Sequence, residues 1–160
     1  MSLIPKAIER AFSAGPIHVE HALRVWDRFR RHRPLGDLAF RRYEELCCIA
    51  LLHDTIRSGQ ASEDELYAEF GPFVAGGVAR TSRPEPPDVA DDPDLQLIMI
   101  LDRVDTLSAE AALLDAPELA RRADELEHRC LPFAHALSSV LAREVVFQLD
   151  DLRRQPHLIQ

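Results

Sequence analysis

Apolar residues recur every three or four positions along most of this chain, and that spacing is typical of amphipathic α-helices. No segment alternates apolar and polar residues as a half-buried strand would. The pattern therefore predicts an all-α fold. Helices are expected over residues 4–14, 17–32, 37–56, 62–70, 73–80, 94–110, 117–130 and 132–152.

Glycine, proline and capping residues mark the boundaries between these helices. Gly15-Pro16 interrupts the periodicity, and proline is favoured at the first position of the helix that follows. Ser62 followed by Glu65 matches the capping box, and Asp92 is placed to cap the helix after it. Residues 84–93 hold four prolines and three aspartates, which predicts a loop.

Two segments are apolar enough to predict where the core lies. Residues 46–52 are apolar nearly all round, so the helix over residues 37–56 is expected to be buried. The final helix is expected to pack along one stripe, formed by Phe133, Leu137, Val140, Leu141, Val145, Leu149 and Leu152. With 160 residues, no internal repeat and no long linker, the chain is expected to form a single domain over residues 1–160.

Charge and composition argue against several classes of protein. Lysine and arginine number 19 against 27 acidic residues, a net charge of −8, whereas binding a nucleic-acid polymer needs a basic surface. No apolar segment is long enough to span a membrane, and the first residues lack the regions of a signal peptide. The cytoplasm is therefore expected, with the three cysteines as free buried thiols. Residues 24–34 hold five arginines, which form either a solvated helix face or an attractor for an anionic substrate.

Four residues able to bind a metal interrupt the apolar helices. His21 lies on the second expected helix, the pair His53-Asp54 ends the third, and Asp102 follows five apolar residues. Each one alone is explained as a core residue satisfied by its neighbours, but a helical bundle can bring such residues to one point. Two imidazoles and two carboxylates form a ligand set for a divalent ion, whose charge would make the burial of two carboxylates tolerable.

The order and context of these residues resemble the H…HD…D signature of HD-domain metal-dependent phosphohydrolases. HALRV surrounds His21, ALLHD ends with the doublet, and LDRVDTL contains Asp102. Within that superfamily, ALLHDTI, EFG, VAGGVARTS and ILDRVDTLS are similar to the RelA/SpoT-type (p)ppGpp hydrolases, the small alarmone hydrolases. The likeness is strongest over residues 5–110, and residues 111–160 would complete an HD-domain helical bundle.

The resemblance implies both a cofactor and a reaction. A divalent metal ion is expected, with manganese first and iron or zinc as alternatives. The implied ligands are His21, His53, Asp54 and Asp102. The implied reaction is hydrolysis of a small phosphorylated molecule, with Asp54 as the catalytic residue. In this reaction the bound metal lowers the pKa of a water molecule and polarises a phosphoryl oxygen.

Three features depart from the alarmone-hydrolase pattern. Arg57 and Ser58 replace the two acids of HDxxED, Thr106 replaces an asparagine, and the basic segment ending in Pro-Tyr before the first histidine is missing. Arg57 either clamps a phosphate beside the metal or complements the helix dipole. Arg24, one turn after His21, faces either the same pocket or solvent. These two arginines are the expected substrate-binding residues.

Other residues near the signature have two interpretations each. His18 could replace His21 as a ligand or lie at the surface. Asp105 could join the site or pair with a surface cation. Glu63 and Asp64 could supply the missing acid, although capping and solvation also explain them.

The functional hypotheses belong to different classes. The first is a metal-dependent phosphohydrolase of a small phosphorylated molecule, a nucleotide, with a (p)ppGpp-type pyrophosphohydrolase as the specific candidate. The alternative enzyme is a 5′-nucleotidase-like phosphomonoesterase. A catalytically degenerate HD fold would bind metal or nucleotide without turnover, and loss of the two acids favours it. In the last interpretation, the four residues never meet.

Overall fold

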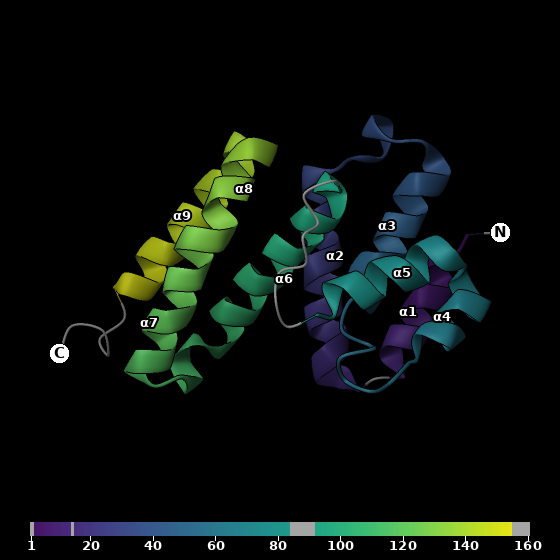
Figure 1. Cartoon of the computed structure of the whole chain (residues 1–160), viewed down its shortest axis with the longest axis horizontal. Helices are drawn as coiled ribbons and strands as arrows, with labels where there is room; N and C mark the ends of the chain where they lie inside the picture. The colour runs from purple at the N-terminus through teal and green to yellow at the C-terminus, as the bar shows by residue number, and fades with distance from the viewer. Residues whose placement is uncertain (1, 14, 84–91, 155–160) are drawn as a thin grey trace. The chain divides into compact units, whose positions relative to one another are not determined.

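A computed structural model describes residues 2–13, 15–83 and 92–154 (Figure 1). Within these residues every regular element is helical and no strand is present, which confirms the all-α prediction. None of the helices in this described part of the chain is both long and apolar enough to cross a membrane. The expected loop over residues 84–93 lies largely outside the described residues, and Pro93 itself is the first residue of a helix.

Contacts within the chain divide it into two compact units, Met1–Met99 and Ile100–Gln160. One helix, α6 (Pro93–Glu110), begins in the first unit and ends in the second. That the two units together form a single HD-type domain over residues 1–160 stays a prediction.

The first unit is built around α3. Its helices are α1 (Ile4–Phe12), α2 (Pro16–His32), α3 (Phe40–Leu52), α4 (Glu63–Phe70) and α5 (Pro72–Thr81). Helices α1, α2 and α5 each pack against α3, and α4 packs against α5. The predicted burial of residues 46–52 is confirmed, because every one of them is buried. The largest fully buried side chains of this unit include Phe29, Leu46, Ile49, Leu51, Leu52 and Leu66.

The predicted boundaries in the first unit are confirmed at two points. Gly15, with a φ of 95°, occupies a backbone conformation that suits glycine and leads into Pro16 at the start of α2. The capping box forms as predicted: the Ser62 hydroxyl accepts from the Glu65 backbone N–H at 3.2 Å, and the Glu65 carboxylate accepts from the Ser62 N–H at 2.8 Å.

The third helix is shorter than predicted at both ends. It was expected over residues 37–56, but it begins at Phe40, after a 3₁₀ turn over Leu35–Asp37, and ends at Leu52. The chain then continues in turns, because the Thr55 N–H bonds to the Leu52 carbonyl at 2.9 Å instead of one residue further back. His53 is consequently the C-terminal cap of α3, and Asp54 lies beyond it.

The start of α6 is held by polar contacts within the first unit. Asp92 caps it as predicted, since its Oδ1 accepts from the backbone N–H groups of Asp94 and Leu95, each at 3.2 Å. Arg33 at the end of α2 donates to the Asp94 carboxylate at 2.8 Å, and Arg42 of α3 lies 3.1 Å from the Asp92 carboxylate. The first turn of α6 is therefore tied to both helices.

The second unit continues from α6 into α7 (Ala116–Glu125), α8 (Leu131–Leu137) and α9 (Ser139–Arg153). The predicted helix over residues 117–130 changes at Leu126 into a π-helical turn, Leu126–Cys130, which runs on into α8. The prediction of one continuous helix over residues 132–152 is wrong. Ser138 adopts an extended conformation and its hydroxyl accepts from the Val140 and Leu141 backbone N–H groups, so it ends α8 and caps α9.

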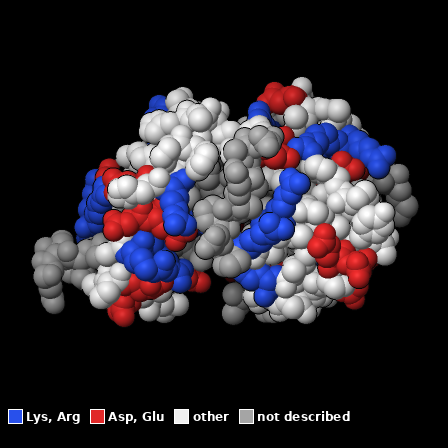
Figure 2. All heavy atoms as spheres, in the orientation of Figure 1, with Lys and Arg blue, Asp and Glu red and all other residues white. Residues whose placement is uncertain are grey.

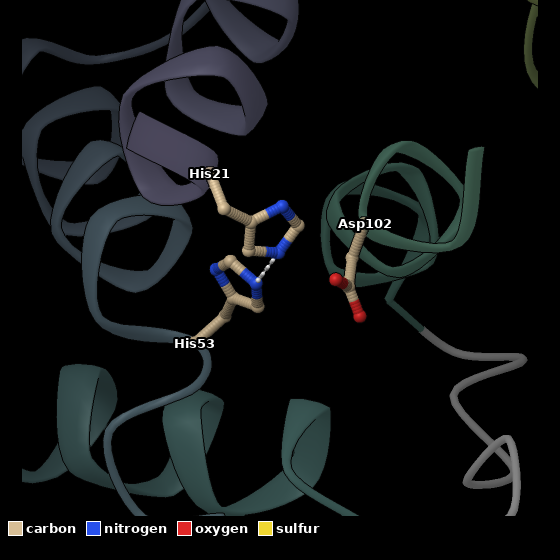
Figure 3. A group of neighbouring side chains, drawn as sticks. All are labelled: His21, His53 and Asp102. Atoms are coloured by element: carbon tan, nitrogen blue, oxygen red, sulfur yellow. Dashed lines mark hydrogen bonds between the residues drawn. The ribbon is translucent and has the colours of Figure 1, made fainter. Parts of the chain in front are cut away.

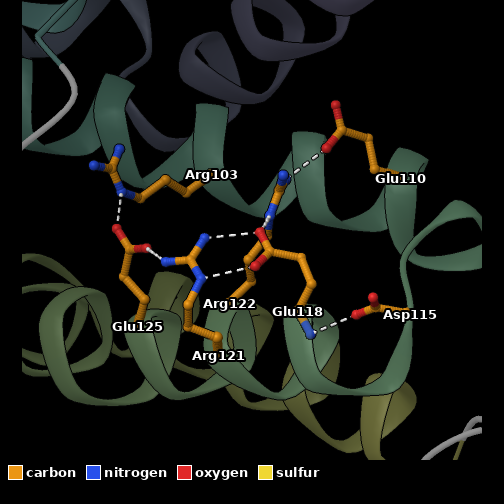
Figure 4. Close-up of polar contacts among 7 residues, drawn as sticks. All are labelled: Arg103, Glu110, Asp115, Glu118, Arg121, Arg122 and Glu125. Atoms are coloured by element: carbon orange, nitrogen blue, oxygen red, sulfur yellow. Dashed lines mark hydrogen bonds and ion pairs between the residues drawn. The ribbon is translucent and has the colours of Figure 1, made fainter.

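Ion pairs join the end of α6 to α7 (Figure 4). Glu118 accepts from Arg121 and Arg122 at 2.8 Å and 2.9 Å, and Arg122 also pairs with Glu110 at 2.5 Å. Arg103 lies 3.3 Å from Glu125. On the visible face of this unit acidic and basic side chains lie intermingled (Figure 2), so the charges compensate one another locally.

The three cysteines, Cys47, Cys48 and Cys130, are free and buried as predicted. Burial raises the pKa of the Cys48 thiol to about 12, and the nearby Glu44 carboxylate adds to the shift. A thiol with such a high pKa stays protonated and unreactive at neutral pH.

Candidate metal centre

Two of the predicted ligands, His21 and His53, meet in the first unit. His21 lies in the second turn of α2, and His53 lies at the C-terminal end of α3, against which α2 packs. Their Nε2 atoms are 3.0 Å apart, and the two rings meet edge to face at an interplanar angle of 68° (Figure 3). His53 is buried with 1% of its surface exposed. Two residues 32 positions apart in the sequence thus direct the same nitrogen of each ring at one point.

The backbone of α3 fixes the orientation and tautomer of His53. Its Nδ1 lies 2.8 Å from the Ala50 carbonyl oxygen. A carbonyl can only accept, so Nδ1 must hold the hydrogen and donate it. In the neutral ring the Nε2 lone pair is then directed at His21. Metal-binding histidines typically donate their second N–H to a carbonyl or carboxylate in this way.

Asp102, on the part of α6 that belongs to the second unit, is the third member of the metal-competent group. One atom from each of His21, His53 and Asp102 lies within 4.8 Å of the others (Figure 3). Asp102 lies on α6 and is buried, with 5% of its surface exposed. Thr106, one turn later on the same helix, donates its hydroxyl to Asp102 Oδ1 at 3.2 Å and so restrains the carboxylate.

This donor set fits a divalent ion. The two Nε2 atoms, 3.0 Å apart, are at the distance of a hydrogen bond between the rings, in which the His21 Nε2–H donates to the lone pair of His53 Nε2. An ion held by both nitrogens at about 2.1 Å would take the place of that hydrogen. Two nitrogen ligands and one carboxylate oxygen suit manganese, iron or zinc better than magnesium or calcium, which favour all-oxygen sites.

Asp54 lies outside this group and contacts two other side chains. Its Oδ1 lies 2.5 Å from Arg57 Nη2, and its Oδ2 lies 3.9 Å from His18 Nδ1. Among the described residues, the metal-competent group contains His21, His53 and Asp102 but not Asp54. The roles of Asp54 as a metal ligand and as the catalytic residue stay predictions.

Among the described residues, none of the remaining candidates belongs to the metal-competent group. Arg24 is exposed on α2, one turn after His21. Asp105 is buried one turn after Asp102, with 2% of its surface exposed. Glu63 and Asp64 are exposed in the first turn of α4. Substrate binding by Arg24 and Arg57 stays a prediction.

Several arginines of the basic segment 24–34 have partners within the first unit. Arg31 pairs with Asp27 one turn earlier, and Arg33 pairs with Asp94. The Arg30 guanidinium lies over the Trp26 ring, 5.0 Å from its centre. These contacts favour a solvated, ion-paired helix face for this part of the segment.

Two supporting residues were not anticipated from the sequence. Ser82, after the end of α5, donates its hydroxyl to the His53 backbone carbonyl at 2.9 Å and holds the chain where α3 ends. Thr106 was noted only as a replacement for asparagine, but its hydroxyl supports Asp102. The four-residue spacing between Asp102 and Thr106 could have indicated this contact, whereas nothing near Ser82 in the sequence points to His53.

A second group with metal-competent atoms, Asp124, Glu127 and His128, lies on the surface of the second unit. Glu127 pairs there with Arg153, and the His128 ring bonds through Nδ1 to the Asp124 carbonyl at 2.9 Å. Surface pairing explains this group without a metal.

No protein-family model matches the sequence, and no curated protein matches it either.

Proposed function

We propose that the protein is a metal-dependent phosphohydrolase acting on a small phosphorylated molecule, with nucleotides as the first substrate class to test. The observation that supports it best is the convergence of the His21 and His53 Nε2 atoms at 3.0 Å, with His53 oriented by the Ala50 carbonyl. The order of the histidines and aspartates along the chain, which resembles the HD-domain signature, links this pair to phosphate chemistry.

His21, His53 and Asp102 are the residues proposed to hold the ion, with manganese first and iron or zinc as alternatives. When bound, such an ion lowers the pKa of a water molecule and polarises a phosphoryl oxygen. Thr106 keeps the Asp102 carboxylate in place. The buried free cysteines fit a reducing compartment such as the cytoplasm.

Arg57 is the proposed phosphate-binding residue. Its side chain is 45% exposed, so a substrate phosphate can reach it, and it already binds one anion, the Asp54 carboxylate. Arginine binds phosphate oxygens through paired hydrogen bonds. A phosphate that takes Arg57 away from Asp54 would leave this carboxylate, next in sequence to a metal ligand, available to the metal and to the attacking water.

A second candidate function is binding of metal or nucleotide without turnover. The ion pair between Arg57 and Asp54 favours this binding function, because hydrolysis needs the Asp54 carboxylate and Arg57 already binds it. The guanidinium also stands where the HDxxED pattern has an acid, and arginine cannot act as a base at neutral pH.

The first experiment measures bound metal in the purified full-length protein by elemental analysis after incubation with manganese and removal of excess ion. We expect about one ion per chain in the parent, as three shared ligands imply, and its loss in His21→Gln and His53→Ala. His135→Ala is the control, since His135 is exposed on α8. Circular dichroism identifies any variant that fails to fold, and His21→Gln, at a half-buried position, is the less disruptive of the two. A parent without metal, or folded variants that keep it, would overturn the proposal.

The second experiment separates the two candidates. The manganese-loaded protein is offered nucleoside 5′-monophosphates and guanosine 3′-pyrophosphates, and released phosphate or pyrophosphate is measured beside calorimetric binding. Turnover that is lost in His21→Gln supports the hydrolase, and the released product distinguishes the nucleotidase from the alarmone hydrolase. Metal-dependent binding with no turnover supports the binding function instead.

A further inference from the structure

Helix α9 has two apolar faces, of which only one is used within the second unit. Leu141, Val145, Leu149 and Leu152 are buried as predicted, whereas two other residues of the predicted stripe, Phe133 and Val140, are 45% and 54% exposed because Ser138 breaks the helix between them. Val146 and Phe147 point elsewhere, with 39% and 71% of their surfaces exposed. A phenylalanine this exposed at the middle of a helix costs solvation free energy, which its burial against a partner would recover.

Charged residues of opposite sign flank this apolar centre. Arg143 and Asp150 are seven residues apart, so they lie on the same side of α9, with the apolar pair between them. Together with His135 of α8 they line a shallow hollow of about 420 Å³. Helices α8 and α9 lie side by side (Figure 1).

We infer that this face binds the same face of a second copy of the chain, with the two α9 helices antiparallel. A two-fold axis midway between Val146 and Phe147 brings Val146 of one copy against Phe147 of the other. The same axis brings Arg143 against Asp150, because both pairs are centred on the same point of the sequence. Each contact then occurs twice, as two-fold symmetry requires.

The charge pattern is what selects a second copy over an unrelated partner. In an antiparallel pair, Arg143 of each copy meets Asp150 of the other copy, so the surface is complementary to itself. The arrangement also has the layout of a protein interface, with an aromatic centre and charged residues at the rim. The proposal does not depend on the metal centre, because none of these residues belongs to it.

The test measures the mass of the full-length chain by sedimentation equilibrium over a range of concentrations. Chelator is present, so that no metal bridge can hold two copies together. We expect a reversible dimer in the parent. Phe147→Asp should weaken association at least about ten-fold, since central aromatic residues dominate interface energy. Asp150→Arg should weaken it to a similar degree by placing like charges together.

A charge exchange makes the test specific. Arg143→Asp alone should weaken association, and the double variant Arg143→Asp with Asp150→Arg should restore it to within about three-fold of the parent, because the pairing is only reversed. Asp151→Arg is the matched control: it makes the same charge change one residue along an exposed part of α9, on a different side of the helix, and should leave association unchanged.

Four results would overturn the proposal. The first is a parent that stays monomeric at every concentration. The second is a dimer unaffected by Phe147→Asp in folded protein. The third is a charge exchange that fails to restore association. The fourth is an Asp151→Arg variant that weakens association as much as Asp150→Arg does. Exposure of Phe147 and Asp150 means that these substitutions should leave the fold intact, which circular dichroism checks.

Discussion

Two neighbouring glycines of α5 should respond in opposite ways to the same substitution. Gly76 has open space where a Cβ would stand, with no atom within 4 Å. A Cβ at Gly77 would lie 2.3 Å from Ile49 Cδ1 and 2.9 Å from its Cγ1. Ile49 is fully buried in α3, so its side chain has no free volume to move into.

The magnitudes follow from two opposing effects. Alanine in place of a mid-helix glycine gains about 0.5–1 kcal/mol, because the unfolded chain loses conformational freedom. Overpacking a full core costs about 1–3 kcal/mol. Gly76→Ala receives only the gain, whereas Gly77→Ala receives both. The two variants should therefore differ in free energy of unfolding by about 1–3 kcal/mol, with Gly76→Ala the more stable.

Urea unfolding followed by circular dichroism measures the difference. A third variant tests its cause: Ile49→Val removes Cδ1 and should cost about 0.5–1.5 kcal/mol in the parent, but less in the Gly77→Ala background, where it relieves the clash. If both alanine variants change stability equally, or if Ile49→Val costs the same in both backgrounds, close packing of α5 on α3 is refuted.

Other predictions concern the polar contacts. Arg57→Ala should raise manganese affinity about two- to five-fold by releasing Asp54, while Arg57→Lys, which keeps the charge, should change the affinity less. Calorimetry measures both affinities, and an unchanged affinity in Arg57→Ala would mean that Asp54 does not contact the metal. Ser138→Ala should lower stability by about 1 kcal/mol through loss of the α9 cap, whereas no loss in urea unfolding would favour one continuous helix. Hydrogen bonds from Arg121 and then Arg122 lower the pKa of Glu118 to about 2. Its stabilising contribution should therefore be present above its unfolded pKa of about 4.3 and be lost as the pH falls toward 2; comparison with Glu118→Gln across this range measures it, and a stability difference that does not shrink would contradict the pairing.

The helices were predictable because their causes are local. Apolar spacing, Gly15-Pro16 and the Ser62 capping box act within a few residues of one another, and each has the predicted effect. Burial of residues 46–52 followed from a run with no polar face. His21 and His53 were also predictable as partners, since each is a polar ring among apolar neighbours and the short sequence around each resembles the HD-domain signature. Their Nε2 atoms do meet.

The ends and breaks of helices were harder to predict, because competing hydrogen bonds decide them. Whether α3 stops at Leu52 or continues to Ile56 depends on Thr55 bonding to Leu52, and on Ser82 reaching the His53 carbonyl from α5. The apolar spacing of the last segment continues through Ser138, so periodicity alone gave no sign that its hydroxyl would cap a new helix.

The sequence alone determined that the chain is helical and which residues could form a metal centre. Tertiary structure decided which of them meet. Once α3 ends at Leu52, the turns that follow direct Asp54 toward Arg57 and leave His53 facing His21. Packing within the second unit likewise buries one of the two apolar faces of α9 and leaves Phe147, on the other face, exposed. The physical reason is common to both outcomes: a repeat in sequence specifies the faces that an element has, but only neighbouring elements determine what each face contacts.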